Sequence, residues 1–253
     1  MKTILKFVGI VVAFMAILTV GSCDTDDVYV PYNPSFANAL VTVKPNAEGG
    51  FFMQLNDSVV LLPANVSQSP YGNKEVRALV NCYRVKDNGQ TGAGKFDNSY
   101  SVYVNWMDSI LTKNIVNFPS ENVDELYGND AVEIVDDWTT VAEDGYLTLR
   151  LRTLWGNDGV AHKVNLLYKG IKDGVFQVEL RQDAMGDTKG HWGDALVAFN
   201  LKDVNMAPQK EAKLALHYLS FSGEKTVTFS LEGRKYDLTS AESSPAPYSA
   251  RLK

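Results

Sequence analysis

The sequence predicts an all-β protein in which a small closed barrel is followed by an antiparallel β-sandwich. Apolar and polar residues alternate with a period of two along most of the chain, which is typical of strands with one buried face. Turn signals such as Asp144-Gly145 and Asp173-Gly174 separate the alternating runs. No long segment has the apolar spacing of an amphipathic helix, so these patterns favour sheets over helices throughout.

Residues 38–112 contain the segments expected to form the barrel. Four or five strands in about 75 residues is the size of a small closed barrel such as an OB-fold. Phe51–Leu62 is long enough to bend at Asn56-Asp57 and supply two strands. The expected strands are Ala39–Val43, Phe51–Leu62, Lys74–Val85 and Ser99–Leu111.

Residues 113–239 contain the segments expected to form the sandwich. In Tyr146–Thr153 the inward positions are Leu147, Leu149 and Leu151, and Val175–Arg181 repeats the pattern. Further strands are predicted at Lys213–Leu219 and Thr226–Leu231. A short helix is predicted to begin at Ser120, which would cap it, and to end at Gly128. Residues 240–253 are predicted to form a flexible tail.

Composition excludes several classes of protein. The chain has 253 residues, and its 24 Lys and Arg against 30 Asp and Glu give a net charge of −6. Residues 38–112 have six basic and six acidic residues. We therefore expect no binding to a nucleic-acid backbone. The two cysteines exclude a disulfide scaffold and a four-thiolate zinc site, and they permit one disulfide.

The N-terminus has the pattern of an export signal. Lys2 and Lys6 precede the apolar run Phe7–Val20, which is shorter than the about 20 residues that span a bilayer. The segment Val20–Cys23 resembles a bacterial lipobox. We expect residues 1–22 to be removed and Cys23 to carry acyl chains such as palmitate, so that no cysteine pair remains for a disulfide. Ordinary signal cleavage and a short uncleaved anchor are the alternatives.

Residues 23–37 form an acidic, proline-containing tether. Asp24, Asp26 and Asp27 follow the lipidation site directly, and prolines at 31 and 34 disfavour a helix. One interpretation is a solvated linker. The other is that the acidic cluster resembles the signal that sorts lipoproteins of Bacteroidota to the outer face of the outer membrane.

Six segments follow one another along the chain in a familiar order: Val80–Val85, Ala131–Trp138, Gly145–Arg150, His162–Leu167, Glu179–Arg181 and Ala198–Leu201. In that order they resemble the NigD-like lipoproteins of Bacteroidota. The resemblance implies an N-terminal OB-like domain followed by a C-terminal β-sandwich, and it does not establish an activity. The family name comes from a bacteriocin-associated gene cluster, and Asn200 replaces an expected Asp.

Asp136 and Asp137, with Glu133 upstream, are the most obvious candidates for carboxylate catalysis. A glycosidase needs two carboxyl groups on either side of one sugar bond. Adjacent residues of a strand point to opposite faces, so this pair does not meet one substrate unless the strand has ended. We interpret the cluster as a polar strand end and expect no catalytic residue.

The loop 182–194 supplies weak candidates for a metal site, namely Asp183, Asp187, His191 and Asp194. Loops of this kind also collect Gly and Asp for turn formation, and no EF-hand spacing is present. We expect neither a metal nor another cofactor.

Trp155 and Trp192 stand near predicted loops, where an indole can form a platform for a sugar or a protein. The alternative is that each tryptophan caps the core of the sandwich. Cys82 lies in a Val-rich strand and is expected to pack as an apolar residue. Ser58 and Ser109 each follow an Asp and precede an aliphatic residue, which resembles O-glycosylation sites of exported Bacteroidota proteins.

These patterns together predict a lipid-anchored protein of the cell envelope, at the outer membrane. Exposure on the outer surface follows from the sorting interpretation of the acidic tether. We expect a non-catalytic binding or assembly module whose ligand is a glycan or an envelope protein. A secreted β-sandwich hydrolase acting on glycans is the first alternative. The second is an accessory lipoprotein of a bacteriocin system, which rests on the family name alone.

Overall fold

A computed structural model describes residues 35–46, 49–86, 96–157, 159–202 and 212–231. All of these described residues belong to one compact unit. The predicted signal peptide, lipidation at Cys23, the sorting residues Asp24, Asp26 and Asp27, and the tail lie outside the described residues. No helix in the described ranges is long and apolar enough to cross a membrane.

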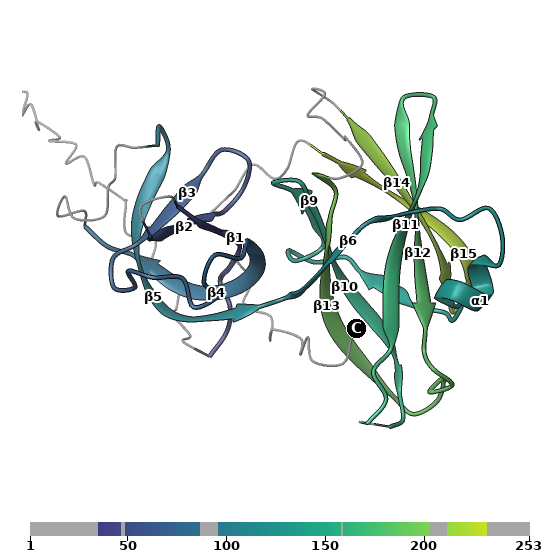
Figure 1. Cartoon of the computed structure of the whole chain (residues 1–253). Coiled ribbons are helices and arrows are strands. Elements are labelled where there is room, and N and C mark those ends of the chain that lie inside the picture. Colours follow the sequence, from purple (N-terminus) through teal and green to yellow (C-terminus); the bar gives the residue numbers. More distant parts are fainter. Residues whose placement is uncertain (1–34, 47–48, 87–95, 158, 203–211, 232–253) are drawn as a thin grey trace, which may run out of the picture. The chain divides into compact units, whose positions relative to one another are not determined.

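The first domain is a closed five-stranded barrel (Figure 1), with strands in the order β1-β2-β3-β5-β4. β3 and β5 pair in parallel and the other neighbours are antiparallel. Asn56 forms the predicted bend, because its side chain accepts the backbone N–H groups of Ser58 and Val59. The strands are β1 (Ala39–Pro45), β2 (Phe51–Gln54), β3 (Val60–Pro63), β4 (Val76–Arg84) and β5 (Ser99–Ser109).

The barrel interior is filled by alternate side chains of its strands. Val41, Val43, Met53 and Val80 are fully buried there. Cys82 packs in the same cluster, and burial raises the pKa of its thiol to about 12. The expectation that Cys82 packs as an apolar residue is therefore confirmed.

The second domain consists of two packed five-stranded sheets (Figure 1). In the first sheet the order is β6-β13-β10-β8, with β9 also paired to β10. Its strands are β6 (Leu111–Asn114), β8 (Glu133–Val135), β9 (Val141–Glu143), β10 (Tyr146–Trp155) and β13 (His191–Asn200). In the second sheet the order is β15-β14-β12-β11-β7. Its strands are β7 (Val116–Asn117), β11 (Lys163–Lys172), β12 (Val175–Asp183), β14 (Lys213–Ser220) and β15 (Gly223–Ser230).

The sheets of the sandwich are mixed, whereas the sequence predicted antiparallel sheets. β6 pairs in parallel with β13, β7 with β11, and β12 with β14. The chain leaves β12 for β13 in the other sheet and then returns to β14, so β14 arrives in the same direction as β12. Alternation within one strand contains no information about such a crossover.

The inner faces of both sheets match the predicted pattern. Leu147, Leu149 and Leu151 of β10 are buried against Val178 and Leu180 of β12 in one core cluster. Thr148 is also fully buried, although it points to the opposite face of β10. That outer face packs against the barrel, in a cluster that includes Leu40, Leu79, Tyr146, Leu196 and Ala198.

Two local expectations differ from the structure. Leu111 and Thr112, counted with the barrel in the sequence, belong to β6 of the sandwich. The short helix α1 (Val123–Tyr127) begins after Asn122, whose side chain makes no capping bond, rather than at Ser120. Gly128 ends the helix as predicted, with a positive φ and its N–H bonded to the Asp124 carbonyl.

Candidate ligand-binding site

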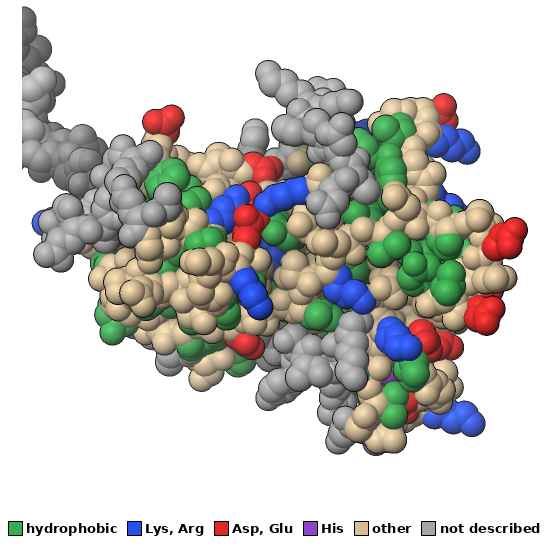
Figure 2. Space-filling model, viewed as in Figure 1, with side chains coloured by type: hydrophobic (Ala, Val, Ile, Leu, Met, Phe, Trp, Pro, Cys, Tyr) green, Lys and Arg blue, Asp and Glu red, His purple; other side chains and the backbone are tan. Residues whose placement is uncertain are grey.

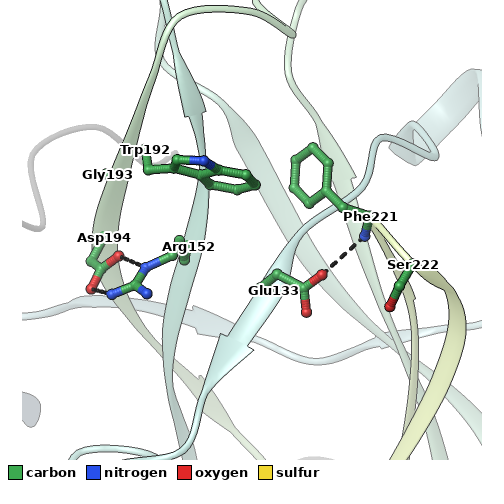
Figure 3. Close-up of a pocket in the computed structure, with 7 residues that line it drawn as sticks. All are labelled: Glu133, Arg152, Trp192, Gly193, Asp194, Phe221 and Ser222. Carbon is green, nitrogen blue, oxygen red and sulfur yellow. Dashed lines mark hydrogen bonds and ion pairs between the residues drawn. The ribbon is translucent and has the colours of Figure 1, made fainter.

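The sandwich carries a hollow of about 770 Å³ (Figure 3). Strands β8, β10 and β13 supply one part of its lining, and the β14–β15 turn supplies the other. A volume in this range is usual for a small-molecule site. The lining residues are Glu133, Arg152, Trp192, Gly193, Asp194, Phe221 and Ser222.

Two exposed aromatic rings form the apolar wall of the hollow. Trp192 is 57% exposed and Phe221 is 45% exposed. Their ring centroids lie 4.9 Å apart at an interplanar angle of 74°, so one ring meets the other edge to face (Figure 3). Trp192 thus has the exposure that a ligand platform needs.

Trp155 does not have that exposure, and the platform interpretation is wrong for it. Only 5% of Trp155 is exposed, and its indole stacks on His162 at 4.1 Å. Its Nε1 donates to the carbonyl of Gly193 at 3.0 Å. The core interpretation is therefore the correct one, because Trp155 lies behind the strand segment that carries Trp192.

The contact between Trp155 and Gly193 leaves no room for a side chain. A Cβ atom at residue 193 would lie 2.6 Å from Cδ1 of Trp155. The strand therefore sits directly on the buried indole at this point. This packing fixes the backbone between Trp192 and Asp194, and so it holds both side chains at the hollow.

A charge-balanced cluster lies beside the aromatic wall. Asp194 accepts hydrogen bonds from Nε and Nη2 of Arg152 at 2.6 and 2.9 Å (Figure 3). Arg150 contacts Asp194 at 2.6 Å and also Asp137 at 2.6 Å. Burial raises the pKa of Asp194, but the bonds from Arg152 and Arg150 outweigh it and hold that pKa below its usual range.

Glu133 supports the turn that carries Phe221. Its Oε1 accepts the Ser220 hydroxyl at 2.6 Å and the Phe221 N–H at 3.1 Å, and its Oε2 contacts Lys225 at 3.1 Å. Burial raises the pKa of Glu133, but these three bonds outweigh it and lower the pKa. Glu133 is thus an ionised support and not a proton donor at neutral pH.

The structure gives the two adjacent candidate carboxylates, Asp136 and Asp137, different surroundings. Asp137 accepts the N–H and hydroxyl of Thr139 and contacts Arg150, whereas Asp136 is exposed. These contacts agree with the interpretation of a polar strand end.

The weak metal candidates have other partners. Asp187 accepts the N–H groups of Gly156 and Asn157, Asp183 lies 3.6 Å from Lys163, and Asp194 is paired with two arginines. His191 is exposed on β13. Over the described ranges, no three His, Cys, Asp or Glu residues are grouped to hold a metal.

Sequence reasoning missed Phe221, Arg152 and the role of Glu133. Ser222-Gly223 was a visible turn signal, and an aromatic residue directly before it was a cue for an exposed ring. The partners of Arg152 and Glu133 come from other strands, at separations of 42 and at least 87 residues. Local sequence patterns do not encode such pairings.

Residues 40–110 match the NigD-like N-terminal OB domain, and residues 114–231 match the NigD-like C-terminal beta sandwich domain. The chain belongs to the NigD-like family. The resemblance drawn from the sequence is therefore confirmed. None of the curated proteins matches the chain.

Solved structures from Bacteroides and Parabacteroides share the NigD-like architecture. A candidate toxin-related protein from Parabacteroides distasonis is 28% identical, with a TM-score of 0.61, over 79% of this chain and 94% of that one. A NigD-like immunity protein from Bacteroides caccae is 19% identical, with a TM-score of 0.52, over 75% of this chain and 90% of that one. A candidate lipoprotein from Bacteroides fragilis is 14% identical, with a TM-score of 0.51, over 76% of this chain and 96% of that one.

Proposed function

We propose that this NigD-like protein is a lipid-anchored module of the outer membrane that binds a neutral glycan in the sandwich hollow without converting it. The Val20–Cys23 lipobox pattern supports the anchor. The name of the Bacteroides fragilis neighbour is in keeping with it. The observation that carries the binding function is the exposed Trp192–Phe221 wall over a concave, polar floor.

The aromatic wall suits the apolar face of a sugar ring. Apolar side chains are exposed at several separate places on the face shown in Figure 2, which is normal for a protein surface. Two large rings in contact beside a hollow are instead a feature of binding sites. An indole offers a rigid surface with two rotatable bonds, so little conformational entropy is lost when a ligand packs on it. The C–H face of a pyranose ring is flat enough to lie on Trp192.

The charge balance of the floor favours a neutral ligand over an ion. Arg150 and Arg152 are paired with Asp137 and Asp194, and Lys225 is paired with Glu133. An ionic ligand would have to compete with an existing pair. Sugar hydroxyls can instead form additional hydrogen bonds with the carboxylate and guanidinium groups, because each of these groups has more donor or acceptor positions than one partner fills.

The state of the carboxylates supports a non-catalytic role. General-acid catalysis at neutral pH needs a carboxyl group that keeps its proton, which requires a raised pKa. The pKa values of Asp194 and Glu133 are lowered instead. Hydrolysis of a glycan, the alternative, would have to use Asp136 and Asp137 at the polar strand end.

A glycan array tests this function with protein that begins at residue 24, which keeps every described residue of the barrel and the sandwich. We expect saturable binding to neutral glycans, loss of that binding in Trp192→Ala, and no release of reducing sugar. Leu126→Ala, at an exposed position on α1, is the matched control. Turnover that disappears in Asp136→Asn or Asp137→Asn would overturn the proposal in favour of a hydrolase.

Two variants test the anchor and its location separately. Cys23→Ala should move the protein from the membrane fraction to the soluble fraction and abolish labelling with palmitate. Asp26→Ala with Asp27→Ala should reduce cleavage by protease added to whole cells, if the acidic tether sorts the protein to the surface. Unchanged cleavage would leave Asp24, Asp26 and Asp27 as a simple linker.

A role in bacteriocin tolerance is a second candidate, favoured by the name of the Bacteroides caccae neighbour. Deletion of the gene should then increase killing by a bacteriocin of the same community. This candidate is compatible with glycan binding, because an envelope receptor can be masked by a protein that occupies its glycan.

A further inference from the structure

The barrel contains a second cavity, of about 360 Å³, which is independent of the sandwich hollow. It opens at one end of the barrel, where β1, β3 and β5 begin and β2 and β4 end. The β2–β3 turn, with Asn56 and Ser58, forms part of the rim. Mouths of β-barrels are frequent ligand sites, and this volume lies within the usual range.

The floor of this barrel cavity is apolar. Leu55, Leu61, Cys82 and Val102 line it, and all four belong to the barrel core. Each of them keeps a small exposed fraction of 4 to 7%, which indicates that the mouth reaches into the core cluster. An apolar ligand group in this position would bind more tightly with each methylene that it buries.

The described part of the rim is polar. Asn38, Asn56 and Asn98 contribute amides, and Arg84 is the one charged residue among the lining residues that the structure describes. The Arg84 guanidinium lies 4.3 Å from the ring centroid of Tyr100, which holds the cation at the entrance. Beside it, the exposed Tyr83 ring stacks on Tyr103 at 5.3 Å.

We propose that the barrel mouth binds a medium-chain carboxylic acid, with its alkyl chain on the apolar floor and its carboxylate at Arg84. At about 30 Å³, the share of one water molecule in the liquid, the cavity of about 360 Å³ has room for about 12 groups of that size. Decanoate has a comparable number of non-hydrogen atoms. The guanidinium matches a carboxylate in charge and in fork geometry, and among the described lining residues no carboxylate competes for it.

Calorimetric titration of protein that begins at residue 24 with hexanoate, octanoate and decanoate tests the proposal. Affinity should rise by up to about fourfold for each added methylene and then level off beyond decanoate, because further methylenes stay outside. A long membrane acyl chain would instead give affinities that continue to rise with length.

Three variants test whether decanoate binds at the barrel mouth. Val59→Trp places an indole at the mouth and should abolish decanoate binding, whereas Leu126→Trp adds the same group at an exposed position of α1 and should not. Arg84→Gln should weaken decanoate about three- to tenfold and leave decan-1-ol unchanged.

The same titration on Trp192→Ala separates this cavity from the aromatic wall of the sandwich. Binding that survives in Val59→Trp but is lost in Trp192→Ala would overturn the proposal, as would the absence of heat at millimolar decanoate. The Trp192→Ala variant in the glycan array reports on the sandwich, and the Val59→Trp variant in the titration reports on the barrel, so the two proposals fail independently.

Discussion

Trp155 is buried and Trp192 is exposed, and the alternation of apolar residues along their strands predicts this difference. The alternation that buries Leu147, Leu149 and Leu151 places position 155 inward when it is continued along the strand. On β13 the inward positions Ala195, Val197 and Phe199 leave position 192 outward. Extension of the period of two was therefore sufficient to distinguish the two indoles. Both tryptophans are also close to turn-forming Gly and Asp residues, which suggested a loop position for each of them.

Gly193→Ala should destabilise the protein by about 1–3 kcal/mol, because the added Cβ overlaps the Trp155 indole. Chemical denaturation measures the loss. Gly159→Ala is the control, since its Cβ would meet only the Asn157 side chain at 3.3 Å. Equal stabilities of the two variants would contradict a strand seated on Trp155.

Asp194→Asn should cost about 2 kcal/mol of unfolding free energy at pH 7 and less at pH 3. The pKa of Asp194 is lowered in the folded protein, so its stabilisation is complete above the unfolded value of about 3.9. It is lost as the pH falls through the folded-state pKa. Urea unfolding at both pH values measures this difference, and a cost that does not depend on pH would refute the pairing with the arginines.

At the scale of elements, the strands were predictable and their partners were not. The bend in Phe51–Leu62 followed from its length and from Asn56, which now accepts the N–H groups of the turn. The parallel pairing of β12 with β14 depends on a crossover through β13 in the other sheet. Non-local hydrogen bonds decide that order, and they leave no local pattern.

Leu149→Ala should destabilise the protein by about 2–5 kcal/mol, because Leu149 is fully buried between the two sheets. Leu126→Ala on α1 makes the same chemical change at a position that is 59% exposed, and it should change stability by less than about 0.5 kcal/mol. Thermal unfolding of both variants checks the assigned inner face. A small loss at Leu149 would argue against the predicted core.

At the scale of the whole described unit, a buried ion pair connects barrel and sandwich. Arg77 of β4 donates to Glu143 of β9 at 2.8 Å, to Thr148 at 3.3 Å and to Thr42 at 3.0 Å. The Arg77 and Glu143 side chains are fully buried. Leu40 and Leu79 were a cue to this contact, because they are apolar on the face of the barrel that would otherwise meet solvent.

Arg77→Met should destabilise the protein by about 3–5 kcal/mol, because it leaves the Glu143 carboxylate buried beside an apolar group. The double variant Arg77→Met with Glu143→Leu should recover most of that loss, since both charges are then removed. Differential scanning calorimetry measures both. A double variant that is as unstable as Arg77→Met would contradict the ion-pair account.

The central claim is that the Trp192–Phe221 hollow holds a neutral glycan. Isothermal titration of the strongest array ligand into the protein and into Trp192→Ala and Trp192→Phe tests it most directly. We predict an at least tenfold loss of affinity in Trp192→Ala, partial retention in Trp192→Phe, and unchanged melting temperatures. Equal affinity of the unaltered protein and Trp192→Ala would contradict the claim.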